Sequence, residues 1–63
     1  MFGQRELQAK ILEYETRLAI EEVNYANAIK SHKNYETLRA IRNDIRDINE
    51  ELQTLYLIRD QQM

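Results

Sequence analysis

The sequence predicts an all-α protein: a two-helix antiparallel hairpin (αα-hairpin) that pairs with a second copy into a dimeric four-helix bundle or coiled coil. Two observations support this prediction. Apolar side chains recur at alternating spacings of three and four residues, which places them on one stripe of a helix. The chain also has no proline, and its one glycine is Gly3, so no backbone chemistry interrupts a helix after that residue.

The first helix is expected over about residues 4–30. Its apolar stripe consists of Leu7, Ile11, Tyr14, Leu18 and Tyr25. Two carboxylates, Glu21 and Glu22, interrupt this stripe. A second group of apolar residues lies further around the same helix and consists of Leu12, Ala19, Val23 and Ala26. The resulting apolar face is broad, which suits contact with two neighbouring helices rather than one.

A turn is expected at about residues 31–34, where poor helix formers cluster and the seven-residue repeat slips by one position. Asn34 suits the N-cap of a following helix, and Glu36 then lies in its first turn, on the favourable side of the helix dipole. His32 falls in this turn, where a solvated side chain is expected. Because neither glycine nor proline marks the break, the alternative is one continuous helix in a long dimeric coiled coil.

The second helix is expected over about residues 35–62, so the whole chain, 1–63, forms a single hairpin domain. Its apolar stripe has the spacing 3-4-3-4-3 and consists of Leu38, Ile41, Ile45, Ile48, Leu52 and Leu55. In the hairpin this stripe packs against the stripe of the first helix.

Self-association is expected because the chain has fifteen Leu, Ile and Val residues, more than one seam between two helices can cover. Charge favours one orientation of the dimer. Residues 30–46 hold five basic and two acidic groups, net +3, whereas residues 47–63 hold one basic and four acidic groups, net −3. Two antiparallel hairpins therefore place the basic turn of one beside the acidic end of the other.

The sequence predicts no enzyme, because it contains no nucleophile–base pair and no glycine-rich loop. No cofactor or metal is expected, since the chain has no cysteine and its one histidine, His32, forms no Glu-x-x-His pair. Glu21 and Glu22 are instead expected to pair across the hairpin with an arginine between Arg42 and Arg46, setting the register of the helices.

The expected function is that of a small adaptor, accessory subunit or regulator, which acts through helix–helix contacts with itself and with an unidentified protein. Ile20 and Leu57 point away from both stripes and are expected to contribute to the partner surface. The alternative is an RNA-binding or other nucleic-acid-binding hairpin dimer that uses Arg39, Arg42 and Arg46 on one flank of the second helix. The net charge of −2 gives this alternative no general support.

The absence of a membrane-crossing apolar run and of a secretory signal predicts no membrane contact and a cytoplasmic location.

Overall fold

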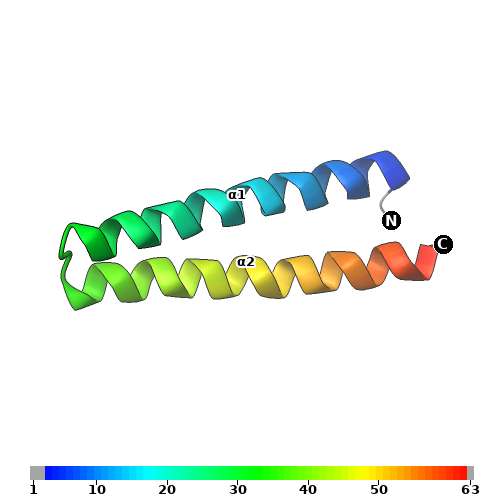
Figure 1. The fold of residues 1–63 in the computed structure, drawn as a ribbon. Helices are drawn as coiled ribbons and strands as arrows, with labels where there is room; N and C mark the ends of the chain where they lie inside the picture. Colours follow the sequence, from blue (N-terminus) through cyan, green and yellow to red (C-terminus); the bar gives the residue numbers. More distant parts are fainter. Residues whose placement is uncertain (1–2, 63) are drawn as a thin grey trace.

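The protein is a helical hairpin, described here from a computed structural model (Figure 1). The structure describes residues 3–62, and the side chains of residues 3–61. Helix α1 spans Gln4–Lys30 and helix α2 spans Tyr35–Gln62. The two helices run antiparallel over their whole length, so Gln4 and Gln62 lie at the same pole of a rod measuring 45 × 14 × 14 Å (Figure 1). The hairpin is thus confirmed, and the continuous helix is excluded. The pairing of two hairpins stays a prediction.

The hydrophobic core extends from the chain ends to the middle of the hairpin. Five aliphatic side chains, all at most 6% exposed, form one cluster there: Leu7, Ile11, Ile48, Leu52 and Leu55. Four partly buried side chains pack against this cluster: Tyr14, Leu18, Tyr56 and Ile58. Burial of each large aliphatic contributes roughly 2 kcal/mol, so this cluster is the main source of contact energy between the helices.

The half of the hairpin nearest the turn is packed less completely. Tyr25 from α1 and Leu38, Ile41 and Ile45 from α2 continue the two stripes but are only half-buried. Ala28 is buried at this level, at 6% exposure, whereas its neighbour Ile29 is 49% exposed. The seam is therefore sealed near the chain ends and open to water toward the turn.

The turn is a Schellman motif followed directly by an N-cap. The His32 N–H donates to the Ile29 carbonyl at 3.1 Å, and the Lys33 N–H donates to the Ala28 carbonyl at 3.0 Å. These two bonds satisfy carbonyls that the end of α1 leaves unpaired. Asn34 Oδ1 then accepts a hydrogen bond from the Thr37 N–H at 2.9 Å, which confirms Asn34 as the cap of α2.

His32 occupies the position of this motif where glycine is usual. Its φ of 55° lies in the left-handed region, which costs about 1–2 kcal/mol for a residue with a Cβ. The motif thus forms without glycine, and this is why the sequence shows no conspicuous break between the helices.

We expect His32→Gly to raise the free energy of unfolding by about 1 kcal/mol, because glycine adopts positive φ without the steric cost. The measurement is urea unfolding followed by helical circular dichroism at one fixed protein concentration. Ser31→Gly is the matched control: Ser31 has a φ of −86°, so glycine relieves no strain there and should leave the protein no more stable. Equal effects of the two substitutions would contradict a strained His32.

Candidate functional site: interaction surfaces of the hairpin

The structure divides the predicted interface residues between the interior and the surface of a single hairpin. The five core residues are already covered within one chain, so a partner can contact them only if the hairpin opens. The remaining stripe residues, Tyr14, Leu18, Tyr25, Leu38, Ile41 and Ile45, are half-buried and keep part of their surface for a second molecule. Their role in an interface stays a prediction.

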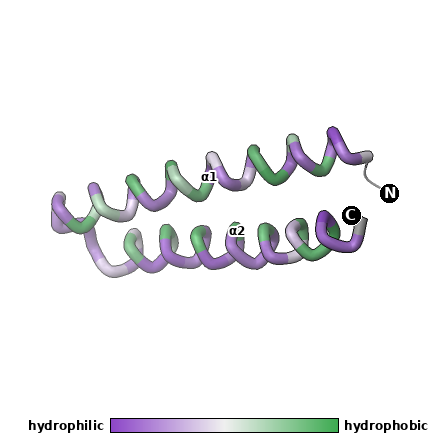
Figure 2. The backbone as a smooth tube through the Cα atoms, turned by 45° about the vertical axis from the view of Figure 1, so that its right-hand side comes forward, coloured by the Kyte–Doolittle hydropathy of each residue, from purple (hydrophilic) through white to green (hydrophobic). Residues whose placement is uncertain are grey.

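Ile20 and Leu57 are exposed, at 53% and 63%, and lie on different helices. Three further aliphatic side chains are similarly exposed, all of them on α1: Leu12 at 65%, Val23 at 58% and Ile29 at 49%. In Figure 2 green, hydrophobic segments recur on the side of α1 that faces away from α2, whereas the corresponding side of α2 is mostly purple. The exposed apolar surface is therefore concentrated on α1.

A groove with an apolar floor lies where the seam is incomplete. It is lined by Tyr25, Arg42, Ile45, Arg46, Asn49, Glu50 and Gln53, and is called the seam groove below. Tyr25 and Ile45 supply the half-buried apolar surface, and the polar and charged residues of α2 supply the rim. An apolar floor with a polar rim is the usual arrangement of a protein–protein contact.

A second hollow between the helices is more highly charged, with Arg17, Ile20, Glu21, Asp44, Asp47 and Ile48 around it. Glu21 lies there half-buried, at a position of the α1 stripe, and Glu22 is exposed. Within residues 3–61 neither glutamate forms an ion pair with Arg42 or Arg46, so the expected Glu–Arg pair across the hairpin is wrong. Glu21 shares the hollow with two acidic side chains, Asp44 and Asp47, and with one basic side chain, Arg17.

The predicted arginine flank is present as a group of exposed side chains. Arg39, Arg42 and Arg46 line one shallow groove on α2 together with Tyr35 and Asn43. Arg46 Nη2 lies 3.6 Å from Asp47 Oδ1, and both side chains are about two-thirds exposed (65% and 64%). Such exposed pairs are weak and screened, so the flank remains basic.

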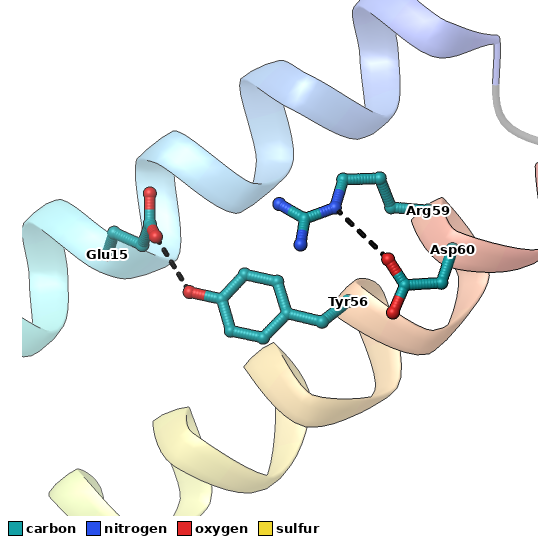
Figure 3. Close-up of polar contacts among 4 residues, drawn as sticks. All are labelled: Glu15, Tyr56, Arg59 and Asp60. Carbon is teal, nitrogen blue, oxygen red and sulfur yellow. Dashed lines mark hydrogen bonds and ion pairs between the residues drawn. The ribbon is translucent and has the colours of Figure 1, made fainter. Parts of the chain in front are cut away.

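The one side-chain hydrogen bond that joins the two helices within residues 3–61 connects Tyr56 to Glu15 (Figure 3). The Tyr56 hydroxyl donates to Glu15 Oε2 at 2.7 Å. The Arg59 guanidinium lies 4.9 Å from the centre of the Tyr56 ring and also contacts Asp60, from Nε to Oδ1, at 3.7 Å. The hydrogen bond to Glu15, with desolvation and the charge of Glu15, raises the pKa of Tyr56 above its ordinary value.

No three His, Cys, Asp or Glu side chains among the described residues come together as a metal site needs. In that same part of the chain, neither helix has an apolar stretch that could span a bilayer.

Comparison with known proteins found no match to a family model, to a curated protein or to a solved structure. The function is therefore argued from the surfaces of the hairpin alone.

We expect Glu15→Gln to lower the pKa of Tyr56 toward its ordinary value near 10, because the acceptor then has no charge. The bond needs a protonated phenol, so its stabilisation is complete below about pH 10 and is lost as pH rises through the raised pKa. The measurement is ultraviolet titration of the tyrosines, with Tyr56→Phe to assign the late-titrating group. Tyr35→Phe, at a side chain 69% exposed, is the control and should leave that late step in place.

Proposed function

We propose that this chain is a non-enzymatic helical interaction protein: an adaptor, accessory subunit or regulator that acts through helix–helix contacts with itself and with a partner protein. In this proposal two hairpins associate as an antiparallel, two-fold dimer and form a four-helix bundle. Each hairpin covers the open part of the other's seam.

The single observation that carries the proposal is the incomplete burial of the seam toward the turn. Five stripe residues that belong to the contact between the helices remain only half-buried: Leu18, Tyr25, Leu38, Ile41 and Ile45. Completing their burial contributes only a fraction of the roughly 2 kcal/mol of a fully buried aliphatic for each side chain. The sum over five side chains is still a substantial part of the stability of a small domain, about 5 kcal/mol, so association stabilises the fold.

The seam groove is the surface that a second hairpin fits best. Tyr25 and Ile45 give it an apolar floor of the kind that the interior of a four-helix bundle contains. Arg42 and Arg46 on its rim belong to the basic segment 30–46, net +3, and an antiparallel copy brings its acidic segment 47–63, net −3, to the same level. These surface charges are screened by salt, so they select the orientation while apolar burial supplies the affinity.

We expect Ile45→Asp to abolish the dimer and most of the helicity, since a carboxylate on the groove floor cannot be buried without losing its hydration. Solution mass by light scattering and helicity by circular dichroism are measured on the same samples. Asn43→Asp adds the same charge at an exposed position of α2 and should keep both the mass and the helicity of the original chain. A cooperatively melting monomer of the unaltered chain at micromolar concentration contradicts the proposal.

A second candidate function is nucleic-acid binding, favoured by the gathering of Arg39, Arg42 and Arg46 around one groove with Tyr35. Arginine can contact phosphate, and an exposed tyrosine can stack on an unpaired base. A two-fold dimer would present two such basic flanks.

If the arginine flank binds single-stranded RNA, affinity should fall steeply with salt, and Arg42→Glu should weaken binding at least about tenfold by replacing a phosphate contact with repulsion. Fluorescence anisotropy with a labelled single-stranded RNA measures both effects. Arg5→Glu makes the same charge change on the other helix and is the control for net charge. Equal losses from the two substitutions, or binding that ignores salt, exclude the arginine flank as a nucleic-acid site.

A further inference from the structure

A second heptad-like stripe runs along α1, separate from the stripe that faces α2. Its six residues follow the spacing 3-4-3-4-3 and are all exposed: Ala9, Leu12, Thr16, Ala19, Val23 and Ala26. These residues are called the outer face of α1 below. Ile20 lies beside them and is 53% exposed. A repeat of this kind keeps one stripe directed at a partner helix, so its spacing indicates a helical occupant.

The shape of the outer face suits close packing of one straight helix. Four of its six residues are alanine or threonine, and only Leu12 and Val23 project as large aliphatic side chains. A shallow hollow lies near its middle, between Ala19, Val23 and the flanking Ile20 and Asn24. Small side chains at a helix contact allow the axes to approach to the short end of the usual range of about 8–10 Å.

The long edges of the outer face are acidic near its middle. Glu13 is three residues before Thr16, and Glu22 is three residues after Ala19, so both border the face, and both are exposed. Two other charged neighbours are directed toward the seam instead. Glu15 accepts the Tyr56 hydrogen bond (Figure 3), and the Arg17 guanidinium lies 5.6 Å from the centre of the Tyr14 ring. A helix seated on this face therefore meets carboxylates at both edges.

A second copy of this chain fits the outer face poorly. An antiparallel two-fold contact that places Leu12 of one copy opposite Val23 of the other also places Arg5 opposite Lys30, at both ends. Like charges set opposite one another at both ends disfavour this pairing.

We propose that the outer face of α1 is a docking site for one helix of another protein, a helix with a narrow apolar stripe flanked by lysine or arginine. The inference rests on the proposed interaction function and names the chemistry of its partner. By helix geometry the outer face lies on the opposite side of α1 from the buried Leu7 and Ile11, so a dimer formed through the seam groove leaves it open on both copies. The basic flanks pair with Glu13 and Glu22, and the apolar stripe covers Leu12, Ile20 and Val23.

The test uses two labelled synthetic helices of the length of α1, with leucine and alanine at the stripe positions. One has lysine at all flanking positions and the other has glutamate. We expect the full chain to bind the lysine-flanked helix at least about tenfold more tightly, measured by fluorescence anisotropy at low salt. The substitutions Glu13→Lys and Glu22→Lys together should reverse this preference.

Val23→Glu separates docking from general attraction between opposite charges. It makes the chain more acidic, so unspecific attraction predicts tighter binding of the lysine-flanked helix, whereas docking predicts a loss of about tenfold or more. The substitution is at an exposed helix position and introduces a better helix former, so the fold is retained. Asn43→Glu, on the exposed side of α2, is the matched control and should leave docking unchanged.

Solution mass distinguishes the two proposals. Val23→Glu should abolish docking of the synthetic helix and leave the dimer intact. If the unaltered chain is a monomer and still prefers the lysine-flanked helix, the proposed dimer is wrong and the proposed docking site stands. Equal binding of the two synthetic helices, binding of neither, or a dimer that dissociates on Val23→Glu overturns the docking site.

Discussion

The structure is governed by one geometric constraint: two helices bury only the strip along which they touch. In this hairpin the strip is sealed by Leu7, Ile11, Ile48, Leu52 and Leu55, which lie between the chain ends and the middle of the helices. Toward the turn the same stripes continue, but water reaches them. The described residues form only α1 and α2, so no third element among them covers this part of the seam, and several large apolar side chains stay exposed. The candidate sites are accordingly faces of helices, with no enclosed cavity among the described residues.

The turn shows how a hairpin forms without the residues that usually mark one. Backbone hydrogen bonds donated by His32 and Lys33 cap the C-terminus of α1. The Asn34 side chain caps the N-terminus of α2 by accepting a hydrogen bond from the Thr37 N–H. All of these contacts are local, so the reversal requires little help from distant packing. The left-handed backbone at His32 is tolerated because two hydrogen bonds and the apolar seam beyond it hold the chain in this conformation.

Much of the fold could be predicted from the sequence, because the spacing of the apolar residues shows which side chains share one face of a helix. Leu38, Ile45 and Leu52 share a face of α2 whatever packs against it. The spacing does not show how deeply each side chain is buried. Ile45 is half-buried and Ile48 is buried, and this difference depends on where the two helices are in contact. The Tyr56–Glu15 bond joins residues 41 positions apart and has no local signature. Charge pairing was the weakest guide, since many side-chain geometries are nearly equal in energy at an exposed surface, and the pairs expected of Glu21 and Glu22 are absent from the described residues. The exposed Leu12 and Val23 belong to the second apolar group of the first helix, which the sequence already indicated as a surface for a second neighbouring helix.

The position of the chain ends has a practical consequence. Residues 4 and 62 lie at the same pole of the rod (Figure 1). A hairpin with adjoining ends can be grafted into a surface loop of a host domain without prising that loop apart. The hairpin could therefore be inserted into a host domain as a helical extension, and its length of 45 Å would set how far it projects from that domain.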